Sequence, residues 1–550
     1  RYSTGWAKDQ RIYFTAIFSR PMTAFSVYED TVKQTGTEMD TVKVKGVVHF
    51  TTQASEKIVV KVGISPVSTK NALANITAEI PHWDFDRVKA AAYAAWNHEL
   101  GKITIRSGDT SMLRTFYTSL YHTMVAPSIF NDHNGEYLGS DKKVHHSSST
   151  NLTTFSLWDT YRGANPLFTI FQQKRTGDMV NSMLAIYQQQ GKLPVWHLMG
   201  NETNTMPGNS GIHVVTDAYL KGITGFDTSL AWEAVKTSAM LDERGLNYVK
   251  KYHFIPADSM VESVAMGLEY AIADWGIAQM ARKMGKVADH EYFRDRAKNY
   301  TYYLDPSTRF MRGRIAETKW RTPFSPFEAK HMKDDFSEGN SWQYTWLVPH
   351  DVEGLMELLG GEEAFIKKLD SLFVIRGSMG KDASADITGL IGQYAHGNEP
   401  SHHIAYLYAF AGQPWKTADK VRFILDSMYT PTTDGLCGNE DVGQMSAWYV
   451  LSALGFYQVN PANGMYVFGS PLVDEARITM DNGKAFRIIV KNNSAANKYI
   501  QSMTLNGSEY STSFILYKNI VAGGDLVITM GPAPSATWGV AKESRPSSTY

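Results

Sequence analysis

The sequence predicts a multidomain α+β protein in which a β-rich region, a large helical region and a second β-rich region follow one another. Its 550 residues correspond to roughly three to four domains of about 150 residues. Apolar and polar residues alternate before residue 66 and again after residue 456, whereas residues 109–456 show the spacing of helices. This change of period separates the three regions.

The N-terminal region is predicted to be a β-sheet followed by a connecting helix. Valine or isoleucine occupies every second position of residues 60–64, as in a half-buried strand. A helix is expected from about Asp86, with apolar residues four positions apart, to a stop at Gly101. We assign residues 1–66 to a β-sandwich portion and residues 67–108 to a connector that contains this helix.

The helical region spans residues 109–456. Ser259 and Glu262 form a capping-box pattern ahead of one of its helices. So many apolar helix faces can be buried only if the helices stack or close on themselves. No internal repeat of about 20–50 residues indicates a solenoid, so we expect a closed helical toroid.

The C-terminal region, residues 457–533, returns to the period of strands. Asn482 and Gly483 lie between two alternating segments and predict a hairpin with a type I′ turn. The last residues, 534–550, are rich in proline and serine and are expected to form a loose tail.

Charge and composition exclude several classes of protein. The 54 basic and 55 acidic residues leave a net charge of −1, so no basic surface directs the chain to nucleic acid. No apolar run approaches the ~18 residues of a transmembrane helix, so we expect no membrane span. Cys437 is the only cysteine, which excludes an internal disulfide framework and a multi-cysteine zinc site.

Six Asn-x-Ser/Thr sequons favour a glycoprotein, although a chain of this length carries several by chance. They lie at Asn75, Asn151, Asn201, Asn299, Asn492 and Asn506. The chain begins at Arg1 without a methionine, which indicates processing or a fragment. We expect a secreted (extracellular) or periplasmic protein.

Five segments combine carboxylates, histidine, asparagine and tryptophan around glycines. They are residues 156–166, 196–208, 338–351, 396–403 and 436–448. Loops of a helical toroid share one rim, so these distant segments are expected to converge on a single pocket.

Glu338 is a candidate general acid. If it opens a helix, Trp342 and Trp346 lie on the same face one and two turns further on. A carboxyl group beside indole rings is poorly solvated, which raises its pKa and suits an acid. The alternative is a capping glutamate above a buried pair of tryptophans.

Asp441 and Glu440 are adjacent acids between two glycines, ahead of a predicted helix. They could complement the helix dipole, or one of them could activate water. Together with Asn439 they also offer the oxygen ligands that a hard cation prefers. His402 and His403 follow Glu399 and raise the alternative of zinc. Neighbouring residues of a helix point about 100° apart, however, so a structural or hydrogen-bonding role is favoured.

Other chemistries lack their motifs. The chain has no G-x-S-x-G elbow, no Walker A loop and no dinucleotide fingerprint. Carboxylates accompanied by Trp, Asn, Arg and His remain, and this combination is typical of a glycosidase site.

The same segments resemble glycoside hydrolase family 92, the calcium-dependent exo-α-mannosidases that invert the anomeric centre. The resemblance runs from about Gly5 to Gly531. Its best blocks are residues 6–21, 115–127, 157–162, 338–354, 389–417 and 435–472. Long blocks in the same order identify the chain as a member of this family.

The resemblance implies a fold, a reaction and a set of site residues. The fold is a β-sandwich followed by an (α/α)6 helical barrel, here with C-terminal β-strands. Glu338 is implied as general acid and Asp441 as general base. Whether Glu440 shares the role of base stays open. The implied substrate contacts are Trp158, Asp159, Arg162, Glu202, Trp342, His402 and His403. One Ca²⁺ is implied, with Asn398, Glu399 and Asp441 as candidate ligands.

One departure concerns the N-terminus. Family members usually have a further stretch of sandwich upstream of Trp6, and this chain is expected to lack it. A second polypeptide that supplies the missing part is therefore expected as a partner, besides a mannose-containing oligosaccharide.

The implied function is release of terminal mannose from α-mannosides of N-glycan or mannan type. Two alternatives stay open: a carbohydrate-binding protein without catalysis, and another (α/α)6 inverting glycosidase with a different sugar. The preferred linkage depends on the leaving-group subsite, for which residues 376–386 are a candidate.

Overall fold

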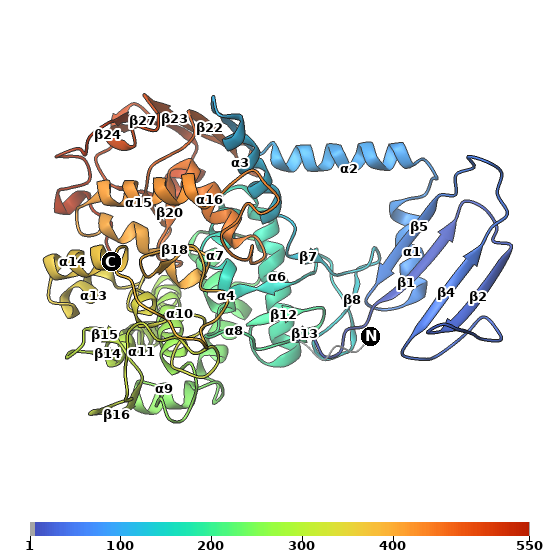
Figure 1. Ribbon diagram of the computed structural model, residues 1–550, viewed down its shortest axis with the longest axis horizontal. Helices are drawn as coiled ribbons and strands as arrows, with labels where there is room; N and C mark the ends of the chain where they lie inside the picture. Colours follow the sequence, from blue (N-terminus) through green and yellow to red (C-terminus); the bar gives the residue numbers. More distant parts are fainter. Residues whose placement is uncertain (1–5, 549–550) are drawn as a thin grey trace.

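A small N-terminal β domain stands to one side of the molecule in the computed structural model, which describes residues 6–548 (Figure 1). Strand β1 (Tyr13–Phe18) pairs antiparallel with β5 (Val60–Ser65). Strand β2 (Ala24–Glu29) pairs with β3 (Val32–Lys33) and β4 (Val44–His49). The alternation of residues 60–64 is therefore that of a strand, as predicted.

Two helices connect this domain to the rest of the chain. The first, α1 (Thr69–Glu79), packs against β5. The second, α2 (Phe85–Leu100), begins after its cap Asp84 and ends at Gly101, close to the predicted bounds. All 16 residues of α2 stay at least partly exposed, and the helix bridges the two parts of the molecule (Figure 1). Strand β6 (Ile103–Arg106) then joins the C-terminal sheet.

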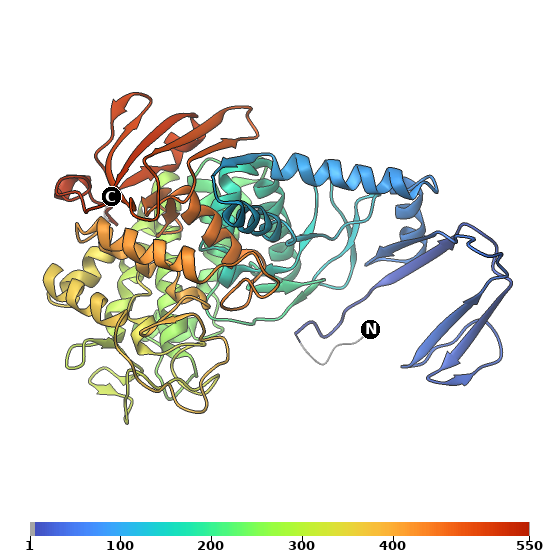
Figure 2. The ribbon, with the colours of Figure 1, turned by 45° about the horizontal axis from the view of Figure 1, so that its top comes forward.

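The helices of the central region gather into one rounded body (Figures 1 and 2). Its helices are α3 (Thr110–Thr123), α4 (Leu157–Thr160), α5 (Ala164–Phe171), α6 (Gln173–Gln190), α7 (Gly211–Leu220), α8 (Thr228–Met240), α9 (Leu246–Tyr252), α10 (Ser263–Lys283), α11 (Val287–Arg296), α12 (Ser341–Tyr344), α13 (Val352–Leu358), α14 (Glu362–Leu372), α15 (Pro414–Ser427) and α16 (Gln444–Leu454). Helix α10 is buried over most of its length, and one continuous apolar core extends from α3 to the C-terminal strands. The predicted fold class, a mixed α+β chain with an N-terminal β domain and a helical domain, is confirmed.

Short strands lie within the segments that connect these helices. They are β7 (Ser128–Ile129), β8 (Glu136–Leu138), β9 (Val144–His146), β10 (Leu152–Thr153), β11 (Phe155–Ser156), β12 (Trp196–Leu198), β13 (Asn201–Glu202), β14 (Leu304–Asp305), β15 (Phe310–Met311), β16 (Arg314–Ala316), β17 (Lys319–Trp320), β18 (Leu390–Ile391) and β19 (Tyr394–Ala395). Among residues 6–548, none of the helices combines the length and the hydropathy that a membrane span requires.

The predicted capping box at the start of α10 is wrong. Glu262 has a left-handed backbone, with φ at 57°, and the Ser259 hydroxyl donates to its neighbour Asp258. The amide groups of Val264 and Ala265 instead donate to the backbone carbonyl of Asp335. A distant segment satisfies this helix end, and a local pattern cannot show that.

The C-terminal region forms two sheets. The larger has the strand order β25-β24-β27-β23-β22-β6, and the smaller has the order β20-β21-β26. Their strands are β20 (Phe456–Gln458), β21 (Met465–Phe468), β22 (Glu475–Thr479), β23 (Ala485–Lys491), β24 (Tyr499–Leu505), β25 (Ser508–Glu509), β26 (Phe514–Leu516) and β27 (Gly524–Gly531), with helix α17 (Tyr517–Val521). Strand β6 of the connector closes one edge of the larger sheet, which ties the connector to the body.

The hairpin of β22 and β23 is confirmed, but its turn differs from the predicted one. Gly483 has a positive φ of 79°, whereas Asn482 does not. Met480 donates its amide to Lys484, and Gly483 donates to Met480. A type I′ turn needs positive φ at both central residues, so this loop is a three-residue turn closed by a glycine bulge.

The described residues after β27, up to Ser548, dock on the helical body and are not the loose tail expected; residues 549–550 of that prediction lie outside the described residues. The amide of Ser548 donates to the carboxylate of Glu353 at 3.0 Å, and its hydroxyl accepts from Val352 at 2.9 Å. Arg545 forms an ion pair with Glu362 at 2.7 Å. The Ser548 hydroxyl thus satisfies the first amide of α13, and the other two bonds hold carboxylates in the first turns of α13 and α14.

Candidate active site

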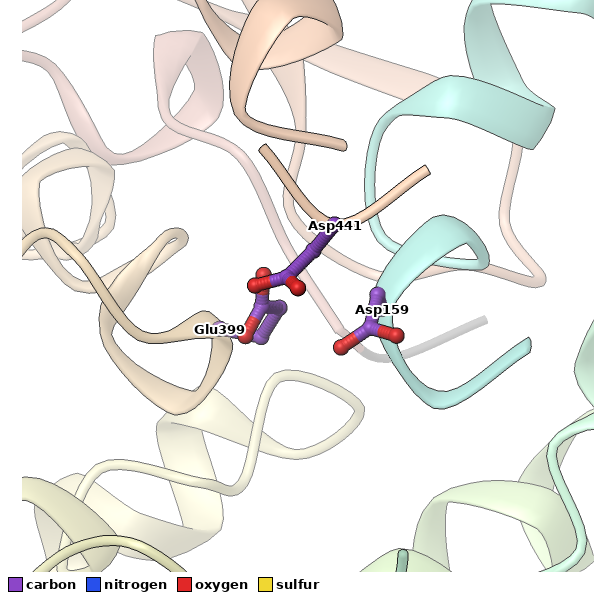
Figure 3. A group of neighbouring side chains, drawn as sticks. All are labelled: Asp159, Glu399 and Asp441. Atoms are coloured by element: carbon purple, nitrogen blue, oxygen red, sulfur yellow. The ribbon is translucent and has the colours of Figure 1, made fainter. Parts of the chain in front are cut away.

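Three carboxylates from distant segments meet inside the helical domain. Asp159, Glu399 and Asp441 each present an oxygen, and these oxygens all lie within 4.8 Å of one another (Figure 3). They come from three of the five segments that the sequence singles out. The predicted convergence of these loops therefore holds for this group.

Asp159 lies on the one-turn helix α4, directly after strand β11. The hydroxyl of Ser156, the last residue of β11, donates to its carboxylate. The side chain is buried, and burial together with the charge of Asp441 raises the pKa of Asp159 well above its usual range. Protonation of Asp159, or its binding to a cation, would remove the free-energy cost of a buried negative charge.

Glu399 is completely buried in a single helical turn that follows Asn398. Within the described part of the chain, no amide, hydroxyl or guanidinium group donates to either of its oxygens. Its side chain lies against the Asp441 carboxylate (Figure 3). Burial, then Asp441 and Asp159, raise the pKa of Glu399 well above its usual range. A buried carboxylate without a donor fits a cation ligand, and three carboxylates are the oxygen donors of a hard cation.

Asp441 lies in a loop of unusual backbone conformation. Asp441, Val442 and Gly443 have φ values of 53°, 56° and 96°. Burial and the charge of Asp386 raise the pKa of Asp441, while its contact with the Glu399 carboxyl group opposes the shift. A β-branched residue in this region is strained, and such strain is concentrated at functional sites.

Glu440 makes the hydrogen bonds of a helix cap. One oxygen accepts from the amide of Gly443 at 2.5 Å and the other from Ser446 at 3.4 Å, at the start of α16. These contacts correspond to the helix-dipole alternative, and the catalytic role of Glu440 stays a prediction.

Glu338 does not open a helix, contrary to the expectation. It has a φ of 48°, and α12 begins three residues after it, behind the cap Asn340. Helix α12 ends at Tyr344, so Trp346 lies beyond it. The carboxyl group is nevertheless poorly solvated. Burial, then the charges of Asp386, Asp441 and Glu262, raise the pKa of Glu338 to about 8. It therefore carries a proton at neutral pH, as a general acid must.

Arg162 supplies a positive charge close to the acidic group. Its Nη2 lies 2.6 Å from Oε1 of Glu269, and its Nε donates to the carbonyl of Trp158. The guanidinium stands 5.0 Å from the Trp158 ring. Its charge also lowers the pKa values of Asp159 and Glu399, although burial outweighs it in both. Trp158, Asp159 and Arg162 thus form one cluster.

The two histidines are buried and neutral. Burial lowers the pKa of His402 to about 3 and that of His403 to about 4. His402 donates from Nε2 to the carbonyl of His396, and His403 donates to the carbonyl of Trp346. These bonds agree with the hydrogen-bonding role expected for at least one histidine.

Trp342 packs against another aromatic ring, and Glu202 closes a β-hairpin. The Trp342 ring packs edge-on against Phe310, with 4.7 Å between the centroids. The Glu202 carboxylate accepts from the amides of Val195, Trp196 and Asn204 at 2.9–3.0 Å, and so closes the β12–β13 hairpin. The structure does not bring Glu202 into the acidic group, and its substrate contact stays a prediction.

Three carboxylates escaped the reasoning from sequence. Asp386 and Glu262 act on Glu338, and Glu269 holds Arg162. Asp386 lies within the range expected for the leaving-group subsite. Glu262 stood out in the sequence only as part of the predicted capping box. Glu269 lies in an apolar helix, and an acidic residue among apolar ones was the one feature of the sequence that could have indicated a function for it.

Known proteins resemble this chain over its whole length. A family GH92 α-mannosidase from Bacteroides thetaiotaomicron, solved with mannoimidazole, is 39% identical with a TM-score of 0.94; the match covers 98% of this chain and 73% of that one. A family GH92 inverting mannosidase from the same organism is 32% identical with a TM-score of 0.90, covering 100% and 76%. An uncharacterized secreted glycosidase from Arthroderma benhamiae is 26% identical, covering 100% of this chain and 69% of its own length.

The family match corrects the expectation about the N-terminus. Residues 1–65 match the glycosyl hydrolase family 92 N-terminal domain. The expected lack of the N-terminal part is therefore not borne out, and no second polypeptide is needed to supply this domain. Residues 71–532 match the glycosyl hydrolase family 92 catalytic domain. This chain belongs to glycosyl hydrolase family 92 and is a glycoside hydrolase whose structural relatives are α-mannosidases.

Proposed function

We propose that this protein is an inverting exo-α-mannosidase that releases terminal mannose from α-mannosides of N-glycan or mannan type. The observation that carries the proposal is the environment of Glu338, a carboxyl group that stays protonated at neutral pH near Asp441 and the acidic group. Relatives with 32–39% identity that are named α-mannosidases or inverting mannosidases support the same chemistry.

Glu338 is the proposed general acid and Asp441 the proposed general base. Glu338 gives its proton to the glycosidic oxygen as the bond to the anomeric carbon breaks. Asp441 takes a proton from the water whose oxygen forms the new bond on the opposite face of the sugar. Because water attacks directly, the product has the inverted configuration. The raised pKa of Glu338 keeps its proton in place until the leaving group receives it.

The acidic group is the proposed Ca²⁺ site. Asp159, Glu399 and Asp441 fit a hard cation because their oxygens converge within 4.8 Å and Glu399 has no donor in the described part of the chain. Asn398 adjoins Glu399, and its Nδ2 donates to the Glu338 carbonyl at 2.7 Å. A bound Ca²⁺ would offset the mutual repulsion of the carboxylates and polarise sugar hydroxyls. Asn398, Glu399 and Asp441 are the proposed ligands, and Asp159 extends that set.

Trp158, Asp159 and Arg162 are proposed to contact the mannose, because they form one cluster beside the acidic group. Trp342, His402, His403 and Glu202 remain proposed substrate contacts with weaker support. Secretion is also proposed, in keeping with the name of the Arthroderma relative.

Hydrolysis of linkage-defined substrates tests this function. We expect mannose from one or more of the α-1,2-, α-1,3-, α-1,4- and α-1,6-linked mannobioses, and no glucose from the matching glucobioses. Release of glucose would favour another inverting glycosidase. Binding of mannosides without any turnover, measured by calorimetry on the same preparation, would favour a carbohydrate-binding protein.

A further inference from the structure

Gln444 lies at the meeting point of the three acid-bearing segments. It is the first residue of α16 and is completely buried. Its backbone amide donates to the carbonyl of Asp441 at 3.1 Å. The strained turn at Asp441 therefore ends on this residue.

The side-chain oxygen of Gln444 reaches the segment of Asp159. Its Oε1 accepts from the amides of Gly163 at 2.9 Å and Ala164 at 3.1 Å, at the start of α5. A Cβ atom at Gly163 would lie 3.2 Å from both polar atoms of the Gln444 side chain. The glycine thus allows the close approach.

The side-chain nitrogen of Gln444 reaches the segment of Glu399. Its Nε2 donates to Nδ1 of His402 at 2.9 Å, while the His402 backbone amide donates to the Glu399 carbonyl at 3.1 Å. Nε2 of His402 donates onward to the carbonyl of His396 at 3.0 Å, so Nδ1 must be the acceptor. His402 is held neutral and in a single tautomer.

We propose that Gln444 is a positioning residue that fixes the positions of Asp159, Glu399 and Asp441 relative to one another. One amide group satisfies the backbone donors of Gly163 and Ala164, four and five residues after Asp159, and Nδ1 of His402, three residues after Glu399. Gln444 itself lies three residues after Asp441. The inference rests on the proposed function, because it makes the rate of the proposed reaction depend on the relative positions of these carboxylates. His402 then serves to relay this positioning.

The test compares two buried glutamines. Gln458 is equally buried and bonds Asp217 and Lys221, away from the acidic group. Gln444→Met and Gln458→Met remove matched amide groups, so both variants should lower the melting temperature. Only Gln444→Met should lower kcat, by about ten- to a hundredfold, with KM within about threefold of the wild type. Gln444→Glu keeps the acceptor for Gly163 and Ala164 but offers no amide donor to Nδ1 of His402, so it should lower kcat as well.

Equal kcat in the Gln444→Met and Gln458→Met variants would overturn the proposal, as would a change confined to KM. If Gln444→Met does not fold, Gly163→Ala replaces it, because its methyl group presses on the Gln444 amide. Hydrogen exchange gives a readout that does not depend on activity. Residues 156–166, 396–403 and 438–446 should all exchange faster in the Gln444 variants but not in Gln458→Met. A wild type without mannosidase activity would refute the proposed function, whereas unchanged exchange would refute the positioning role.

Discussion

Arg162 and Glu269 form an ion pair inside the helical domain, with 2.6 Å between Nη2 and Oε1 and side chains that are 6% and 0% exposed. Glu269 also accepts from the hydroxyl of Tyr161 at 2.9 Å. Burial alone would raise the pKa of Glu269, but Arg162 lowers it below its usual range. The pair is therefore ionised, and its positive end lies close to the acidic group.

Removal of one partner of this pair should destabilise the protein strongly. In Glu269→Ala, the guanidinium of Arg162 remains buried without its counter-ion, so we expect the free energy of unfolding to fall by about 3–5 kcal/mol. Denaturant titration measures it. Glu475→Ala is the control, because Glu475 pairs with an exposed Arg106 at 3.3 Å. This control should cost less than about 1 kcal/mol, and similar losses in both variants would contradict the account of the buried pair.

Replacement of the general acid should affect poor leaving groups most. Glu338→Gln is expected to lower kcat on a mannobiose by roughly 10²–10⁴-fold, because the amide has no acidic proton to transfer. With a dinitrophenyl mannoside, whose leaving group needs no proton, the loss should be far smaller. Asp441→Asn should lose activity on both substrates alike. Equal losses of Glu338→Gln on the two substrates would contradict the role of Glu338.

The pH profile should report the environment of Glu338. Its carboxyl group must be protonated, and its pKa is about 8, so kcat/KM should fall as the pH rises through about 8. The charge of Glu262 contributes to this raised pKa. Glu262→Gln removes that charge, so the alkaline limb should move to lower pH. A limb that stays in place, or moves to higher pH, would show that Glu262 does not act on Glu338.

Calcium should stabilise the folded protein through Glu399. Ca²⁺ at about 100 times its dissociation constant is expected to add about 2.7 kcal/mol to the free energy of unfolding. Glu399→Gln removes the cost of a buried carboxyl group that lacks a donor and whose pKa is raised well above its usual range. It should therefore raise the melting temperature in EDTA and abolish the gain from Ca²⁺. Zn²⁺ should not restore the activity that EDTA removes. A full calcium response in Glu399→Gln would exclude this residue as a ligand.

The order of the domains and the identity of the loops that carry the site could be predicted from sequence, because both have local signals. The periodicity of residues 60–64 and the apolar spacing of the helix that ends at Gly101 act within a few residues. Carboxylates beside glycines marked the loops of Asp159, Glu399 and Asp441, which do meet. The resemblance to the family added the expected roles of these residues.

The remaining features depend on contacts between distant residues, which no local pattern contains. The start of α10 is satisfied by Asp335 and not by Ser259, and Ser548 docks on Glu353. Glu338 lies before its helix, and its pKa reflects Asp386 and Glu262 from other loops. These contacts become visible only once the chain has folded.

The configuration of the first-formed sugar tests the central claim most directly. Proton NMR follows the anomeric signal during hydrolysis of an α-mannoside by a large amount of enzyme, before mutarotation mixes the anomers. Direct attack of water opposite the leaving group predicts β-mannose first, with α-mannose appearing later. α-Mannose as the first product would contradict the single displacement assigned to Glu338 and Asp441.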